Sequence, residues 1–134
     1  MGWRSGYKGM TLFRAELTGQ IISSAIEVPR ELGPGLLESA YRSCLQRELQ
    51  LRSLRVVAEI GIPIHYKGIE ISEGYRADLL VEEEALVELK AIEALLPIHD
   101  AQLLTYLRLC KLRVGLMINF NVKALREGIR RRIL

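Results

Sequence analysis

Residues 75–90, with the sequence YRADLLVEEEALVELK, constrain the fold of this chain more than any other stretch. Two apolar segments flank three consecutive glutamates, which predicts a β-hairpin with residues 82–84 as its loop. Asp78 nevertheless lies inside the first strand, and Glu88 and Lys90 lie at the end of the second. Charged side chains are costly to bury in apolar strands unless they are paired or bind an ion. The hairpin therefore predicts either an ion-pair network or a site for a charged ligand.

The length of the loop determines how the two strands align. If residues 82–84 form the turn, Val81 pairs with Ala85, and counting back along both strands brings Asp78 opposite Glu88. Two directly opposed carboxylates destabilise a sheet, but a divalent cation between them removes the repulsion. The prediction depends on the register, because a slip of one residue would send the two acids to opposite faces.

Two basic residues share this face of the predicted hairpin. The same register places Arg76 opposite Lys90, and alternation puts both on the face that carries Asp78 and Glu88. Diagonal pairs, Arg76 with Glu88 and Lys90 with Asp78, would cancel all four charges without a metal. The hairpin alone leaves the ion-pair network and the cation site as open alternatives.

The rest of the chain predicts a single α/β layer structure. Helical spacing of apolar residues and alternation with a period of two give the order helix, helix, three or four strands, helix, strand. The predicted helices cover residues 16–32, 36–52 and 98–109. The strands cover 55–60, with 62–66 as its continuation or neighbour, then 69–71, 75–81, 85–90 and 113–120. Gly33 is expected to end the first helix, Pro29 to kink or shorten it, and Pro97 to begin the third.

Further polar residues lie next to the apolar faces of two predicted helices. Glu38 falls in the first turn of the second helix, where the dipole favours a carboxylate, and three residues before Tyr41. Gln102 and Tyr106 are four residues apart on the third helix and interrupt its apolar stripe, with His99 near the same face. An ordinary surface glutamate and an ordinary helix edge explain these positions equally. The functional alternative is a second set of hydrogen-bonding groups that point toward the hairpin site.

Size and composition fit one domain at residues 15–134, with residues 1–14 as a flexible N-terminal extension. No apolar run approaches the roughly 18 residues that span a membrane, and the first residues lack the apolar region of a signal peptide. A cytoplasmic protein without a membrane partner is therefore expected. Cys44 and Cys110 lie in helical patterns with apolar neighbours, which predicts reduced core thiols.

Basic residues concentrate near the C-terminus, although the net charge of the whole chain is only +3. This segment has two interpretations, a solvated edge strand or terminal helix, and a patch that contacts phosphate groups. The basic residues concerned are Lys123, Arg126, Arg130, Arg131 and Arg132.

Three motifs in a fixed order give the chain a resemblance to a known family. GLLESAY, with Gly35, Glu38 and Tyr41, resembles the motif that names the GxxExxY family, which belongs to the RecB-like side of the PD-(D/E)xK nuclease superfamily. YRADLLVE followed by ELKAIEAL looks like the metal-site hairpin of that superfamily, and HDAQLLTYL looks like its Q-x-x-x-Y helix. The resemblance runs from about Leu17 to the C-terminus.

The resemblance implies a restriction-endonuclease-like core, in which a mixed central sheet is flanked by helices. It assigns Asp78 and Glu88 as metal-binding carboxylates and the backbone carbonyl of Leu89 as a further ligand. Lys90 is similar to the lysine that orients the attacking water or steadies charge on the phosphate. Glu38 resembles the helical acid that completes the acidic cluster and is a further candidate ligand.

The same resemblance implies roles for the helical residues and for the partners. Gln102 and Tyr106 resemble the pair that supports the site and contacts the nucleic-acid strand, and Tyr41 belongs to the same supporting set. The implied cofactor is Mg²⁺ or Mn²⁺, and the implied substrate is DNA. Relatives often carry His where this chain has Pro29, so a ligand present in them is absent here.

Two functions of different classes follow from these expectations. The first is a metal-dependent nuclease with Asp78, Glu88 and Lys90 as its catalytic core. The second is a module that binds nucleic acid or a partner and keeps the nuclease fold with little or no activity, as the small size of the chain suggests. A homodimer is one way for so small a domain to hold a duplex.

Overall fold

The computed structural model describes residues 14–134, so the predicted extension lies almost wholly outside the described residues. The described part folds as α/β, with seven strands, three α-helices and one short 3₁₀ helix. Its elements are α2 Ala15–Leu32, α3 Glu38–Leu51, β1 Val56–Gly61, β2 Ile64–Tyr66, β3 Ile69–Ile71, β4 Arg76–Val81, β5 Ala85–Lys90, α4 Pro97–Cys110, β6 Val114–Asn119, η1 Leu125–Gly128 and β7 Ile129–Ile133.

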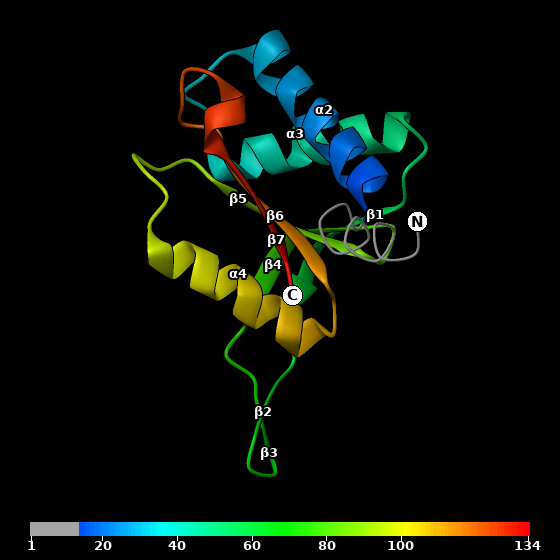
Figure 1. Cartoon of the computed structure of the whole chain (residues 1–134), viewed down its shortest axis with the longest axis vertical. Coiled ribbons are helices and arrows are strands. Elements are labelled where there is room, and N and C mark those ends of the chain that lie inside the picture. The colour runs from blue at the N-terminus through cyan, green and yellow to red at the C-terminus, as the bar shows by residue number, and fades with distance from the viewer. Residues whose placement is uncertain (1–13) are drawn as a thin grey trace, which may run out of the picture.

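A five-stranded mixed sheet forms the centre, with the strand order β1-β4-β5-β6-β7. β5 and β6 run parallel, whereas the other neighbouring strands are antiparallel. Helices α2 and α3 cover one face of the sheet and α4 covers the other (Figure 1). This architecture confirms the predicted restriction-endonuclease-like fold. β2 and β3 form a separate two-stranded ribbon that projects from the body.

The core consists of two apolar clusters, one on each face of the sheet. Leu79 and Val87 join the cluster under α2 and α3, whereas Leu80 and Leu86 join the cluster under α4. β6 is buried along its whole length, because both of its faces are covered by helices. The central strands are therefore rigid supports for any group that lies at their ends.

The helices begin and end close to the predicted positions. α2 continues through Pro29 to its predicted end at Leu32, so of the two expected effects of this proline, a kink or a shorter helix, the shortening does not occur. Gly33 ends α2 with a φ of 82° and donates its N–H to the carbonyl of Pro29. α3 begins at Glu38, two residues after the predicted start, which leaves Leu37 outside the helix and 76% exposed.

The close approach of α4 to the sheet depends on one glycine. A Cβ added to Gly115 on β6 would lie 2.9 Å from a methyl carbon of Leu103 on α4. A larger residue there would force the side chains of Leu103 and Leu107 to shift. In the described part of the chain, no helix is both long and apolar enough to cross a membrane.

Candidate functional site

The β4–β5 hairpin has the predicted register only over part of its length. Val81 pairs with Ala85, and the ladder continues to Leu79 opposite Val87. It ends there, so the expected pairing of Arg76 with Lys90 is not part of the ladder. The strands therefore have regular backbone pairing next to the turn, and this pairing ends at Leu79 and Val87.

Two carboxylates connect the strands where the ladder ends. The backbone N–H of Asp78 donates to Oε1 of Glu88 over 2.9 Å, and the N–H of Leu89 donates to Oδ2 of Asp78 over 2.8 Å. Each acid thus accepts a hydrogen bond from the backbone of the opposite strand, in place of a backbone carbonyl. The reciprocal bonds hold Asp78 close to Glu88, although the direct cross-strand pair expected of the two acids is not part of the ladder.

The strand on the other side of Asp78 is also irregular. β1 and β4 keep one register along their length, but the pair that Glu59 and Asp78 would form is missing from it. Glu59 has a φ of 54°, in the left-handed region that non-glycine residues seldom adopt. Asp78 is therefore the point at which β4 loses regular pairing with both of its neighbours.

An arginine that sequence reasoning missed neutralises part of this charge. Arg42 on α3 donates from Nη1 to Oδ1 of Asp78, and its Nη2 lies 3.1 Å from Oε1 of Glu59. Arg42 follows Glu38 by four residues, a spacing that places both on one edge of a helix and could have been noticed. The side chain of Arg42 is 23% exposed.

The ion-pair network expected as the alternative does not form. Within residues 14–134, no ion pair joins Arg76 to Glu88 or Lys90 to Asp78. Charge in the site is balanced differently, because Arg42 on α3 supplies the cation that the hairpin itself was expected to supply.

Glu88 is the most perturbed acid of the site. Its side chain is only 5% exposed, and burial, with the charge of Asp78 second, raises its pKa to about 7. Lys90 acts in the opposite direction, and Glu38 adds a smaller repulsion. Glu38 thus lies close enough to join the acidic cluster electrostatically. A buried carboxyl group with this pKa beside a second carboxylate indicates negative charge that the protein does not fully compensate.

Tyr41 has a structural role in the GxxExxY motif. Its hydroxyl donates to the carbonyl of Gly33 over 3.1 Å and accepts from the N–H of Leu36 over 3.2 Å. Its ring stacks on Phe120 with the centroids 4.3 Å apart. Only 1% of Tyr41 is exposed, so it holds the loop before α3 and thereby positions Glu38, and cannot touch a nucleic-acid strand.

The predicted pair on α4 is formed. Nε2 of Gln102 donates to the hydroxyl of Tyr106 over 3.2 Å. Burial raises the pKa of Tyr106, and the charge of Glu88 raises it further, which places this hydroxyl beside the acidic site. His99 does not join them, because its Nδ1 accepts the N–H of Leu96 and caps the start of the helix.

The three C-terminal arginines do not form one surface. Arg131 donates from Nε to the hydroxyl of Thr18 on α2, whereas Arg132 lies 3.0 Å from a carboxylate oxygen of Asp100 on α4. Because α2 and α4 cover opposite faces of the sheet, Arg131 and Arg132 point to opposite sides of β7. Strand β7 lies at the edge of the sheet, as the interpretation of this segment as a solvated edge strand predicts.

Both cysteines, Cys44 and Cys110, are free and half-buried.

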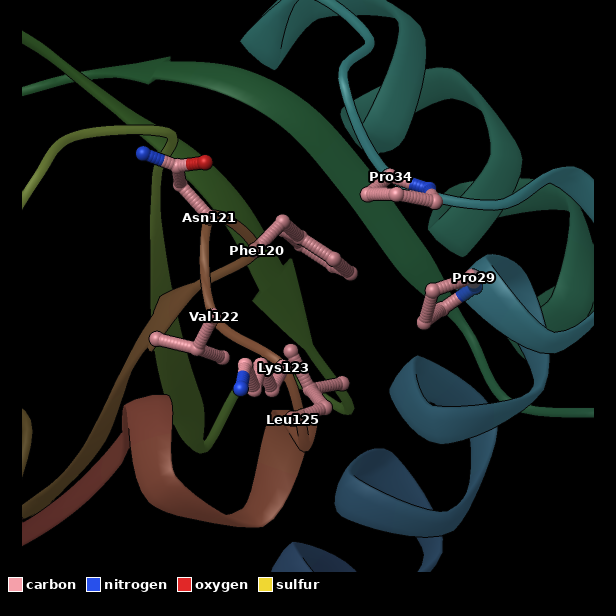
Figure 2. A pocket seen from close by; sticks show the side chains of 7 residues that line it. All are labelled: Pro29, Pro34, Phe120, Asn121, Val122, Lys123 and Leu125. Carbon is pink, nitrogen blue, oxygen red and sulfur yellow. The ribbon is translucent and has the colours of Figure 1, made fainter.

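Two adjoining cavities form a groove beside the end of β5. The larger, about 410 Å³, lies between Pro29, Pro34 and Phe120, with Lys123 at its edge (Figure 2). The smaller, about 170 Å³, shares Phe120 with it and reaches Ala91, the residue after Lys90. The groove therefore runs from the lysine end of β5 toward Lys123.

Buried Asn119 fixes one wall of this groove. Its side-chain oxygen accepts the N–H of Ile92 and its side-chain nitrogen donates to the carbonyl of Ile92. Asn121 donates to the same carbonyl. These bonds tie the segment after β5 to the end of β6 and to Asn121, which lines both cavities.

The acids of the site suit a hard divalent cation in chemistry, although they do not form a complete cage. No three His, Cys, Asp or Glu side chains in the described residues lie close enough together to hold a metal ion. Asp78 and Glu88 nevertheless bring carboxylate oxygens close together, and burial, followed by the charge of Asp78, raises the pKa of Glu88. Cations such as Mg²⁺ are commonly held by one or two carboxylates, with water completing the shell.

Comparison with known proteins gives one match. The family model of the PD-(D/E)XK nuclease superfamily matches residues 15–132, which is nearly the whole described chain. The match extends to the superfamily, and the GxxExxY family within it stays a prediction. Neither a curated protein nor a solved structure matches.

Proposed function

Because the chain belongs to the PD-(D/E)XK nuclease superfamily, we propose that it is a metal-dependent nuclease that hydrolyses the phosphodiester bonds of DNA. Membership of the superfamily suggests nuclease activity, and nucleases of this superfamily generally use divalent metals. DNA as the substrate, and Mg²⁺ or Mn²⁺ as the cofactor, are our proposals. The observation that carries the proposed metal site is the pair of reciprocal hydrogen bonds that hold Asp78 and Glu88 together at the open end of the hairpin.

The chain's own residues have distinct roles in this proposal. Asp78 and Glu88 hold the cation, with the backbone carbonyl of Leu89 as a third donor and Glu38 as a further acid at the edge of the cluster. A bound divalent cation activates water and stabilises negative charge on phosphate. Lys90 follows Glu88 by two residues on β5, so it points to the same side and binds the phosphate or orients the attacking water.

The residues of α4 hold the site rather than react in it. Tyr106 is buried beside Glu88, and Gln102 fixes the position of its hydroxyl. This arrangement keeps the wall of the acidic cluster in place while a substrate binds. Gln102 is half-buried and is the member of the pair that we expect to contact the nucleic-acid strand.

The groove beside β5 gives a nucleic-acid strand a path away from the site. The walls of its larger cavity are mainly apolar and include Lys123, whereas the walls of the smaller cavity are mainly polar. Apolar walls with a nearby lysine suit a nucleotide, because a base has an apolar face and the backbone is anionic. Since stacking hides base faces in a duplex, we expect the groove to receive an unpaired strand.

The alternative is a module that binds nucleic acid or a partner without cutting it. One observation favours it, since Arg42 already binds Asp78 and no complete three-residue ligand set is present in residues 14–134. Intact Asp78, Glu88 and Lys90 favour the enzyme. We expect a cytoplasmic protein, and a homodimer if the substrate is a duplex.

Cleavage of labelled single-stranded, linear duplex and circular DNA tests the proposal. Each substrate is incubated with Mn²⁺, Mg²⁺ or EDTA, and the Asp78→Ala variant is assayed in parallel. We expect cleavage that requires the metal and is lost in the variant. If the wild-type protein and Asp78→Ala are equally inert on every substrate, the binding module replaces the nuclease.

A further inference from the structure

Arg42 and Asp78 form the best-defined ion pair of the site. Asp78 accepts from Arg42 at Oδ1 and from the N–H of Leu89 at Oδ2, so each of its oxygens already has a donor. The bond to Leu89 belongs to the hairpin, whereas the bond to Arg42 comes from a side chain on another element. A cation that binds Oδ1 must therefore compete with the guanidinium of Arg42.

Glu59 binds the second terminal nitrogen of the Arg42 guanidinium. Nη2 of Arg42 lies 3.1 Å from Oε1 of Glu59, while Nη1 binds Asp78. Glu59 is 52% exposed and its backbone is in the left-handed region, a conformation that costs a glutamate free energy. Without Glu59, Asp78 would be the one carboxylate left among the present partners of Arg42 in residues 14–134. The guanidinium would then bind Asp78 more strongly.

We propose that Arg42 is a built-in competitor for the metal site, and that Glu59 retains its guanidinium when a divalent cation binds Asp78. The inference rests on the proposed metal site and adds the residues that set its affinity. Arg42 keeps Asp78 neutralised and structured before the cation binds. When the cation binds, the bond from Nη1 to Asp78 is released and the bond from Nη2 to Glu59 remains, so no charge is left unpaired.

The proposal is testable because it predicts that two substitutions change the affinity for Mn²⁺ in opposite directions. Arg42→Met removes the competitor, and we expect it to tighten Mn²⁺ binding about tenfold, as removal of one charge-assisted bond of about 1.4 kcal/mol implies. Glu59→Gln leaves Arg42 more firmly on Asp78, and we expect weaker Mn²⁺ binding. Arg47→Met, an exposed arginine on the same helix, is the matched control and should bind Mn²⁺ like the wild-type protein.

A double variant separates competition from the general effect of charge. If Glu59 acts through Arg42, Arg42→Met with Glu59→Gln should bind Mn²⁺ as tightly as Arg42→Met alone. If Glu59 merely attracts cations, Glu59→Gln will weaken binding in both backgrounds by the same factor, and this result would overturn the proposal. Arg42→Gln replaces Arg42→Met if circular dichroism shows that the methionine variant does not fold.

Isothermal calorimetry with Mn²⁺ alone measures these affinities without any nucleic acid. Asp78→Ala is titrated in parallel so that the two hypotheses can fail separately. If Asp78→Ala binds Mn²⁺ as well as the wild-type protein does, the proposed metal site and this inference are both wrong. If Asp78→Ala abolishes binding but Arg42→Met equals Arg47→Met, the metal site stands and the role of Arg42 is refuted.

Discussion

In the two halves of the β4–β5 hairpin, different groups form the hydrogen bonds that join the strands. Next to the turn, Leu79 to Val81 pair with Ala85 to Val87 through their backbones, and the side chains fill the core. At the other end, carboxylates of Asp78 and Glu88 accept the hydrogen bonds that join the strands. We call the paired residues 79–81 and 85–87 the paired half, and the residues beyond them, 76–78 and 88–90, the open half. The paired half supplies stability, and the open half keeps charged oxygens in place.

The difference explains how an apolar hairpin can carry a charged site. Buried acids are tolerated when hydrogen bonds satisfy them, and here the hairpin's own N–H groups do so. The remaining cost, which comes first from burial and then from the charge of Asp78, is expressed as the raised pKa of Glu88. Changes in the paired half should reduce stability, whereas changes in the open half should reduce activity and metal binding.

The largest expected effect comes from neutralising the open half. Asp78→Asn and Glu88→Gln keep the shape of each side chain and an oxygen that can accept the backbone bonds. We expect DNA cleavage to fall about 1,000-fold or more, because the cation loses a charged ligand. Initial rates of cleavage measure this, with Glu93→Gln, an exposed acid just beyond β5, as the control. A loss below tenfold would remove the two acids from the catalytic core.

Truncation in the paired half should have the converse effect. Leu79 is fully buried, so Leu79→Ala should lower the free energy of unfolding by about 3 kcal/mol, as for other buried leucines. Urea unfolding measures this, and Val57→Ala, at a 54% exposed position on β1, is the control. Mn²⁺ affinity at low temperature should not change. A large drop in affinity would show that the two halves are not independent.

The pH dependence of stability should originate in the open half. Folding raises the pKa of Glu88 from 4.5 to about 7, so between these values the folded protein binds more protons than the unfolded chain. The contribution of Glu88 is fully present below pH 4.5 and is lost as the pH rises through about 7. In EDTA, the melting temperature should therefore fall from pH 5 to pH 8. Glu88→Gln should flatten this slope, and an unchanged slope would contradict the assignment.

The loop that positions Glu38 offers a smaller test. Tyr41→Phe removes the hydroxyl bonded to Gly33 and leaves the N–H of Leu36 without its acceptor. We expect a loss of about 1 kcal/mol in unfolding free energy, together with slower cleavage if Glu38 matters for the open half. Chemical unfolding and cleavage rates are measured on the same sample. Faster cleavage would show that the loop restrains the site.

The smallest expected effect concerns the groove. Lys123→Ala should weaken binding of a single-stranded oligonucleotide in EDTA about threefold, since one exposed phosphate contact is worth less than 1 kcal/mol. Lys111→Ala, at the far end of α4, is the matched control. Fluorescence anisotropy measures both affinities. Equal affinities for the two variants would exclude the groove as the path of the strand.

Local patterns predicted the hairpin register next to the turn, the start of α4 at Pro97 and the shared face of Gln102 and Tyr106, because each depends on spacing within one or two elements. Arg42 and Glu59 were missed, since their contact with Asp78 joins three elements far apart in the sequence. The left-handed backbone of Glu59 has no sequence signal, because a glutamate rarely adopts it.

The arrangement of the C-terminal arginines could not be predicted for a different reason. The sequence leaves open whether residues 130–132 form an edge strand or a terminal helix. In a strand, successive side chains point to opposite faces, so Arg131 and Arg132 had to separate once β7 formed. The charge of a segment therefore predicts little about a binding surface until its secondary structure is known.

A titration of the ¹⁵N-labelled protein with Mg²⁺, followed by NMR, tests the central claim most directly. The amides of Asp78 and Leu89 donate to the two carboxylates, whereas those of Val81 and Ala85 lie in the paired half. A cation held by the carboxylates should shift the first two amides in a saturable manner and leave the second two nearly unchanged. The shifts should disappear in Asp78→Asn. Equal shifts in both halves, or shifts that persist in Asp78→Asn, would contradict a metal site at the open end of the hairpin.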